Sequence, residues 1–289
     1  MPAWPAESAR RRCIATVCLG GPLEERLAAA AAAGFDGVEV FTGDVAASAR
    51  PAPHIGVLAR DLGLSVEMYQ PFRDAEGAPP GRFGSVTRRM RAALDVAAAL
   101  GAPMLLVCSS VAPDTIDDDD VAAGQLRALA DLAAERGLRL AYEALAWGRH
   151  VRTWQRSWDI VARADHPALG LCLDSFHVLA RNGAPGRIAS LPGDRIFFLQ
   201  LADGAAPPAA GPQTAADIRR WSRHRRLFPL QGEFDLLGFA RAGFASGYAG
   251  PLSLEVFNDE FRQADPRRTA VGAMRSLLRL ENAVRGAAA

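Results

Sequence analysis

Four short apolar runs in the second half of the chain each end in a side chain that can bind a metal ion through oxygen. The runs are residues 138–143, 169–174, 196–200 and 252–255. If they are successive parallel strands of one closed barrel, their carboxyl ends open on the same mouth. We therefore expect one divalent cation to be bound by four residues, Glu143, Asp174, Gln200 and Glu255.

Three carboxylates and one amide oxygen form a hard, oxygen-only set of ligands. Such a set suits Mg²⁺ or Mn²⁺ better than an ion that prefers thiolates, with Co²⁺ as a further candidate. A bound cation of this kind polarises a carbonyl or hydroxyl group of a ligand. A single acid at a strand end is often a helix N-cap, but four such side chains at consecutive strand ends favour a metal site.

Two earlier acids, Glu39 and Glu67, lie in the middle of expected strands. Polar filling of the barrel interior or a surface ion pair explains them as well as function does. We therefore leave both out of the metal set, and we expect Glu39 to lie nearer the base of the pocket.

Histidines are the candidates for proton transfer. His177 follows Asp174 by three residues, a spacing that fits a strand end turning into a helix and presents both side chains to the same mouth. Its imidazole could deprotonate a bound substrate. His150, on the loop after the Glu143 strand, is a second candidate, and the Glu143 carboxylate is a third.

Two arginines indicate the charge of the substrate. Arg73 is expected on the loop after the third strand, and Arg226 on the loop after the seventh. A planar guanidinium pairs bidentately with a carboxylate, so a small anionic substrate is the natural inference. Most of the other arginines in the basic cluster 219–226 are expected to form a solvated loop. No Gly-rich phosphate loop accompanies them.

The elements that must position these residues alternate regularly. Apolar strand-like runs are separated by longer helical stretches rich in Ala, Leu and Arg, and eight such units favour a closed barrel over an open sheet. The expected strands are residues 13–19, 38–41, 64–69, 104–108, 138–143, 169–174, 196–200 and 252–255. The sequence thus predicts an α/β fold, a (β/α)8 TIM barrel.

The size of the chain agrees with one domain of this kind. It has 289 residues, of which 49% are hydrophobic, and an eight-stranded α/β barrel has about 250 residues. We predict a single TIM-barrel domain over residues 1–289, with a flexible N-terminus at 1–12 and an irregular loop at 205–232 after strand seven.

Charge and composition also limit the partners. A net charge of +1 gives no reason to expect a nucleic acid or an acidic membrane. No run approaches the roughly 18 apolar residues of a membrane span, and no signal sequence is evident at the start, so a cytoplasmic location is expected. The four cysteines form no Cys-x-x-Cys pair and are interpreted as buried free thiols. A homo-oligomer is left open.

The strand-end residues resemble a known family. Three acids and a fourth ligand on strands five to eight, together with Asp174-Ser175-Phe176-His177, are similar to the xylose isomerase-like TIM barrel superfamily. Within it, the segments 142–150, 196–203 and 252–259 resemble bacterial 3-dehydroshikimate dehydratases, as do 70–74 and 221–224. Gln200 is the most telling mark, because sugar epimerases of the superfamily usually have histidine there.

The resemblance implies loss of water from 3-dehydroshikimate to give protocatechuate, with His177 as the preferred base. It also implies that Arg73 or Arg226 holds the carboxylate of this small cyclic anion, and that Ser222 and Tyr69 contact it. Some relatives continue into a second domain resembling hydroxyphenylpyruvate dioxygenase. This chain ends at Ala289, and we expect no such domain.

Two alternatives remain at this point. A metal-dependent sugar isomerase or epimerase on the same barrel would share the cation and the proton transfer, but it has less use for arginines at the mouth. A catalytically silent barrel that serves as a binding module would retain no divalent ion, and its melting temperature would not respond to one.

Overall fold

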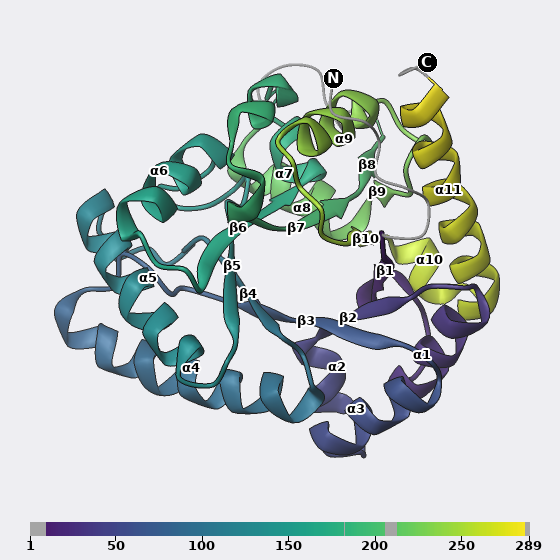
Figure 1. Cartoon of the computed structure of the whole chain (residues 1–289), viewed down its shortest axis with the longest axis horizontal. Coiled ribbons are helices and arrows are strands. Elements are labelled where there is room, and N and C mark those ends of the chain that lie inside the picture. The colour runs from purple at the N-terminus through teal and green to yellow at the C-terminus, as the bar shows by residue number, and fades with distance from the viewer. Residues whose placement is uncertain (1–9, 182, 206–212, 287–289) are drawn as a thin grey trace.

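The computed structural model describes residues 10–181, 183–205 and 213–286. In this part of the chain, eight parallel strands close into a barrel in the order β1-β10-β7-β6-β5-β4-β3-β2, with helices around it (Figure 1). The barrel strands are β1 (Arg12–Ala15), β2 (Gly37–Phe41), β3 (Ser65–Phe72), β4 (Met104–Cys108), β5 (Arg139–Glu143), β6 (Leu169–Asp174), β7 (Ile196–Leu201) and β10 (Leu252–Leu254). The predicted (β/α)8 barrel is confirmed.

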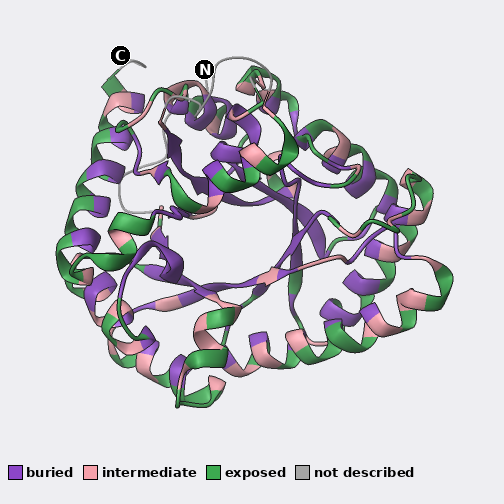
Figure 2. Cartoon of the chain, turned by 180° about the vertical axis from the view of Figure 1, so that it is seen from behind, coloured by how far each residue is buried: buried purple, intermediate pink, exposed green. Residues whose placement is uncertain are grey.

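The strands are apolar along most of their length because both of their faces are covered. Every residue of β4, β6 and β7 is buried, since side chains fill the barrel interior and helices cover its outside. Figure 2 shows the same division, with buried strands and with helices whose exposed surface faces outward. This packing is why the runs read as continuous apolar segments and not as alternating ones.

Local signals in the sequence set the helix boundaries. The side chain of Asp118 caps α5 and that of Thr153 caps α6, while Gly101 ends α4 in a left-handed conformation. The helices are α1 (Leu23–Ala32), α2 (Thr42–Ala47), α3 (Ala52–Asp61), α4 (Pro80–Leu100), α5 (Asp119–Ala134), α6 (Trp154–Ala164), α7 (Ser175–Leu179), α8 (Ala215–His224), α9 (Leu236–Ala245), α10 (Asp259–Gln263) and α11 (Pro266–Gly286). None of the described helices is long and apolar enough to cross a membrane.

The strand register brings the proposed ligands to one end of the barrel. Gln200 of β7 lies opposite Asp174 of β6 and Ser253 of β10. Glu143 is the last residue of β5, and Glu255 directly follows β10. Because neighbouring strands run in the same direction, the side chains at their carboxyl ends converge on one mouth.

The segment after β7 is more regular than predicted. Residues 1–9 and 206–212, which hold most of the predicted flexible N-terminus and part of the predicted loop, lie outside the described residues. The rest of 205–232 contains α8, which begins with a capping box between Thr214 and Asp217. It also contains β9 (Arg226–Leu227), which pairs with β8 (Asp203–Gly204), directly before the segment, in a two-stranded antiparallel sheet.

Candidate active site

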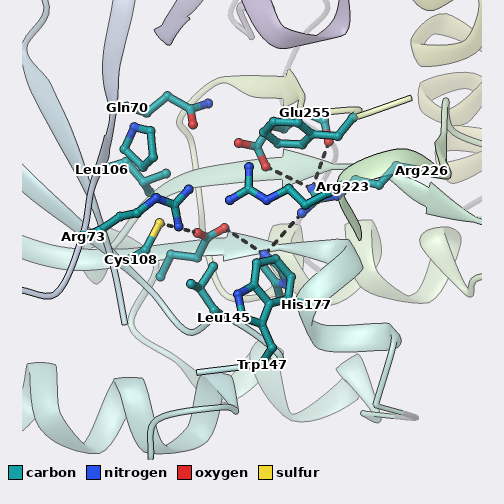
Figure 3. A pocket seen from close by; sticks show the side chains of 13 residues that line it. Gln70, Arg73, Leu106, Cys108, Leu145, Trp147, His177, Arg223, Arg226 and Glu255 are labelled. Carbon is teal, nitrogen blue, oxygen red and sulfur yellow. Dashed lines mark hydrogen bonds and ion pairs between the residues drawn. The ribbon is translucent and has the colours of Figure 1, made fainter. Parts of the chain in front are cut away.

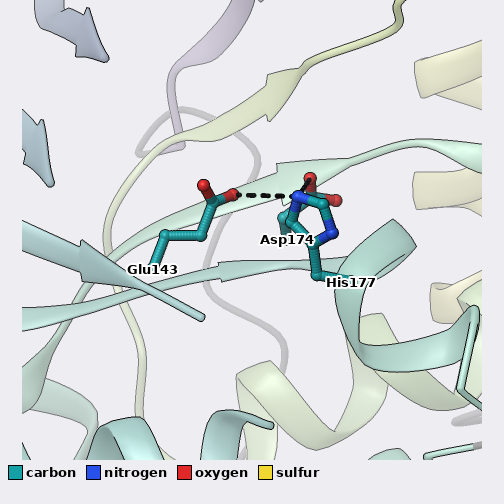
Figure 4. A group of neighbouring side chains, drawn as sticks. All are labelled: Glu143, Asp174 and His177. Atoms are coloured by element: carbon teal, nitrogen blue, oxygen red, sulfur yellow. Dashed lines mark ion pairs between the residues drawn. The ribbon is translucent and has the colours of Figure 1, made fainter. Parts of the chain in front are cut away.

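Glu143, Asp174 and His177 form a buried cluster at the mouth (Figure 4). One ligand atom from each lies within 4.8 Å of the others. His177 Nε2 is 3.7 Å from Glu143 Oε1 and 3.5 Å from Asp174 Oδ2. The two acids therefore come together with an imidazole in a place that little water reaches.

The Asp-x-x-His spacing works because Asp174 caps a short helix. Its Oδ1 accepts a hydrogen bond of 2.7 Å from the backbone N–H of Phe176, and α7 begins at the next residue, Ser175. One turn of helix then carries His177 back over the mouth. The other oxygen of Asp174, Oδ2, faces the cluster.

Arg226 joins two of the acids. Its Nη1 donates to Asp174 Oδ2 at 2.7 Å and to Glu255 Oε2 at 3.0 Å. Its Nη2 donates to Ser222 Oγ at 2.7 Å and lies 3.3 Å from His177 Nε2. Both Ser222 and Arg226, which sequence reasoning placed on the substrate, are fully buried inside this network.

Gln200 lies deeper, in a polar layer of the barrel interior. Its Oε1 accepts a hydrogen bond from Cys172 Sγ at 3.2 Å, and its Nε2 donates to Glu39 Oε2 at 2.6 Å. Glu39 also accepts hydrogen bonds from the amide of Gln70 and the hydroxyl of Ser253. The carboxylate of Glu39 is therefore surrounded by donors directly beneath the mouth.

Burial controls the protonation of the cluster. It raises the pKa of Glu39, Glu143 and Asp174 above the usual range, because an ionised carboxylate away from water is unfavourable. Repulsion from Glu255 acts in the same direction on all three. Burial, followed by the nearby positive charge of Arg226, lowers the pKa of His177 well below its ordinary value. The imidazole is thus neutral at physiological pH.

The cluster has the features of a cation site. Glu143 Oε1 is buried and has no hydrogen-bond donor among the described residues. Buried carboxylate oxygens almost always have a partner, so this one lacks a positive group or a donor. Glu143 and Asp174, with Glu255 beside them, offer the oxygen ligands that a divalent ion takes, and His177 offers a nitrogen.

A narrow pocket opens onto the cluster (Figure 3). Its walls include Arg73, Arg223 and Arg226, together with the aromatic rings of Trp147 and Phe257. Trp147 packs edge-on against His177, with ring centroids 4.8 Å apart. The pocket therefore has arginines and aromatic rings in its walls, next to the acids Glu143 and Glu255.

Two predicted site residues, Tyr69 and His150, lie outside both this pocket and the network around the acids. Tyr69 lines a separate cavity beside Arg89, because Gln70, the next residue on β3, is the one whose side chain points into the barrel. His150 Nε2 lies 3.0 Å from the carbonyl oxygen of Thr115, and its Nδ1 is 3.3 Å from Asp117. Neither residue contacts the cluster in the described structure.

Sequence reasoning missed Arg223 and Trp147. Arg223 was included in the solvated basic loop, but it lies on the last turn of α8 and faces the pocket. A usable signal was present, because Ile218, Trp221 and Ser222 are spaced as one buried helical face. Trp147, on the loop after β5, has no comparable local signal.

Comparison with known proteins agrees with the barrel fold described above. A family model described as "Xylose isomerase-like TIM barrel" matches residues 27–280. A 3-dehydroshikimate dehydratase of Pseudomonas aeruginosa is 51% identical over 275 residues, which are 95% of this chain and 42% of that protein. One of Neurospora crassa is 29% identical over 325 residues, covering 92% of this chain and 89% of that protein.

A solved structure is similar over the same region. It is a "xylose isomerase-like TIM barrel/4-hydroxyphenylpyruvate dioxygenase fusion protein", with a TM-score of 0.91 and 47% sequence identity. The match covers 96% of this chain and 43% of that one. The chain thus spans less than half the length of the Pseudomonas relative and of the fusion protein.

Proposed function

The chain belongs to the xylose isomerase-like TIM barrel family, and on that basis we propose that it is a metal-dependent 3-dehydroshikimate dehydratase. The reaction removes a proton and a hydroxyl group from adjacent ring carbons of 3-dehydroshikimate. The products are protocatechuate and one molecule of water. We propose a single TIM-barrel domain over residues 1–289 as the unit that performs it.

The observation that carries the proposal is the buried cluster of Glu143, Asp174 and His177 beneath a pocket with positive walls. A neutral sugar has less use for guanidinium groups in its pocket than a cyclic carboxylate has. The Neurospora crassa relative supports the same reading, because 89% of its length is matched by this chain.

We propose Glu143, Asp174, Gln200 and Glu255 as the residues that hold a divalent cation, with Mg²⁺ or Mn²⁺ as the leading candidates. When bound, the cation polarises a substrate oxygen and so makes the neighbouring C–H bond more acidic. Glu143 and Asp174, whose pKa burial raises, would ionise when a cation binds, because its charge would offset their mutual repulsion.

His177 is the proposed base. The backbone nitrogen of Ala146 lies 3.3 Å from Nδ1, and Arg226 Nη2 lies 3.3 Å from Nε2. A neutral imidazole has only one nitrogen with a free lone pair, and we place it at Nε2, with the ring hydrogen on Nδ1. Nε2 also faces Glu143 and Asp174, so a proton received there is stabilised by carboxylates. The low pKa of His177 keeps the ring free of that proton until the substrate supplies it.

The rest of the pocket orients the substrate and excludes water. Arg73 is the proposed partner of the substrate carboxylate on the β3 side. Trp147 and Phe257 are buried and close the walls around the ring. Arg226, with Ser222 behind it, holds Asp174 and Glu255 in place from the opposite side.

Absorbance spectroscopy tests the proposal. Protein treated with a chelator and then dialysed is incubated with 3-dehydroshikimate, with and without added Mg²⁺, Mn²⁺ or Co²⁺. We expect aromatic absorbance to appear only when an ion is added, and Glu143→Gln to remove it. Ketohexose conversion by the loaded protein, with no aromatic product from 3-dehydroshikimate, would instead identify a sugar isomerase or epimerase.

A further inference from the structure

Arg223 is a mostly buried cation that lies against two aromatic rings. Its guanidinium lies over the ring of Phe257, 4.7 Å from the centroid, and 5.7 Å from that of Trp147. Within the described residues, no carboxylate or other acceptor forms a hydrogen bond or ion pair with it. Packing on rings satisfies the flat faces of a guanidinium, but its N–H donors stay unused.

The charge of Arg223 is also unfavourable where it lies. Burial and then the positive charge of Arg73 lower the pKa of Arg223 to about 10, and the opposing attraction of Glu255 is smaller. Arg73 likewise has no ion pair through its side chain among the described residues. Figure 3 shows the two guanidinium groups pointing toward each other across the pocket. Two unpaired cations that face one another favour an anion between them.

Arg226 differs from this pair in its surroundings. Its guanidinium already donates to Asp174, Glu255 and Ser222, and it is fully buried. Among the described residues, the N–H donors of Arg226 are therefore already used by neighbouring side chains, whereas those of Arg223 are not. Arg226, which the sequence offered as an alternative to Arg73, is thus hydrogen-bonded to the acids.

We propose that Arg223 and Arg73 together bind the carboxylate of the substrate, while Arg226 remains with the acid cluster. This inference rests on the proposed function, since it assigns the carboxylate of that substrate to a place in the pocket. The ring of the substrate then extends from the two arginines toward His177, and Phe257 supports the Arg223 guanidinium from behind. Arg223 is a specificity residue that selects ring compounds bearing a carboxylate.

A matched pair of ligands isolates the carboxylate. Protocatechuate and catechol share the ring and both hydroxyl groups and differ only in that group. Calorimetry on Mn²⁺-loaded protein gives the dissociation constant of each ligand for the wild type, Arg223→Met, Arg223→Lys and Arg220→Met. Arg220 is an exposed arginine of the same helix and serves as the control.

We expect Arg223→Met to weaken protocatechuate binding roughly 10- to 100-fold and to leave catechol binding unchanged, as for loss of a charged hydrogen bond. Arg223→Lys should recover part of the loss, and Arg220→Met should change neither ligand. Equal effects on both ligands, or no effect on either, would mean that Arg223 only packs on the rings, and the inference would be wrong.

Kinetics separate this inference from the proposed function. Arg223→Met should raise KM for 3-dehydroshikimate more than it lowers kcat, because the carboxylate does not react. If the wild type forms protocatechuate but KM is unchanged in Arg223→Met, the inference is wrong and the proposed function stands. If the wild type binds protocatechuate through Arg223 but does not form it from 3-dehydroshikimate, the proposed function is wrong and the assignment of Arg223 stands.

Discussion

His177 is the residue on which proton transfer depends in the proposed mechanism. Replacing it with Ala should lower kcat by roughly 10² to 10⁴, the usual contribution of a positioned base. Metal content should change far less, since Glu143 and Asp174 remain. Steady-state rates and metal analysis of the same preparation measure the two effects. Because the pKa of His177 is lowered, wild-type turnover should not fall through protonation of this group between pH 8 and pH 6.5.

His150→Ala is the matched control for this prediction. His150 contacts Thr115 and Asp117 outside the pocket, so its removal should leave kcat within a few-fold of the wild type. Normal turnover in the His177→Ala variant would exclude His177 as the base and would return that role to Glu143.

Glu39 determines which end of the Gln200 amide faces the mouth. Glu39 Oε2 accepts a hydrogen bond from each of the NH₂ groups of Gln70 and Gln200, so both groups point toward it. The oxygen of Gln200 is thereby turned away from Glu39. Replacing Glu39 with Gln puts a donor against these donors, and we expect Mn²⁺ affinity to fall roughly 10- to 100-fold, as for other residues that orient metal ligands.

Calorimetric titration of chelated protein with Mn²⁺ measures this affinity. Glu67→Gln is the control. Glu67 is a strand acid like Glu39, but it lies on β3 and forms an ion pair with Arg11. We expect its affinity for Mn²⁺ to match the wild type. If Glu39→Gln bound Mn²⁺ as tightly as the wild type does, Gln200 would need no orientation from Glu39.

The sequence indicates the positions of these residues better than their contacts. Glu143, Asp174 and Gln200 each end an apolar run, so their common location follows from the fold alone. Contacts depend on side chains from distant segments. Gln200 and Glu39 are 161 residues apart and meet only inside the closed barrel, so no local pattern predicts that pair.

At the scale of elements, α8 shows where pattern reasoning fell short. The segment is basic and follows a Pro-rich stretch, so it was predicted to be irregular. Its capping box and narrow buried face nevertheless specify a helix, and that helix carries Arg223 into the pocket. A polar helix with one thin apolar stripe gives a weak signal because most of its residues face solvent.

Two glycines within helices allow the effect of packing on stability to be measured apart from that of conformational freedom. Gly124 of α5 is exposed, and a Cβ there meets nothing within 4 Å, whereas a Cβ on Gly56 of α3 would lie 2.5 Å from the carbonyl oxygen of Leu100. Gly124→Ala should stabilise the protein by about 0.5 to 1 kcal/mol because it lowers the entropy of the unfolded chain. Gly56→Ala should destabilise it, because α3 packs closely against the end of α4.

Urea unfolding followed by circular dichroism gives both free energies. The two substitutions are chemically identical, so their difference reports the space around each glycine and not helix propensity. Equal stabilisation by both would mean that the contact between α3 and Leu100 relaxes at little cost.

At the scale of the whole molecule, the barrel contains several buried acids whose pKa values are raised, chiefly by burial. Glu39, Glu143 and Asp174 are in the polar interior and the mouth, and Glu76, whose pKa is raised to about 7, lies on the loop after β3. Between the pKa of the unfolded chain and the higher folded pKa, only the folded protein keeps these protons. Stability therefore falls as pH rises, by about 1.4 kcal/mol per pH unit for each such group.

Metal binding should reverse this dependence. Ligands must be deprotonated to bind a cation, so Mn²⁺ affinity rises with pH in the range where the metal-free protein loses stability. We expect the melting temperature of chelated protein to fall from pH 5 to pH 8, and saturating Mn²⁺ to raise it most at pH 8. An ion at 100 times its dissociation constant adds about 2.7 kcal/mol.

Glu76→Gln tests whether the two effects have separate origins. Glu76 Oε1 accepts a hydrogen bond from the backbone N–H of Ser110, and the residue is not part of the cluster of Glu143, Asp174 and His177. The variant should lose the part of the pH dependence that falls between pH 4.5 and about 7, and its response to Mn²⁺ should equal that of the wild type. A melting temperature that ignores Mn²⁺ at pH 8 in both proteins would contradict the metal site itself, because a cation that binds only the folded barrel must stabilise it.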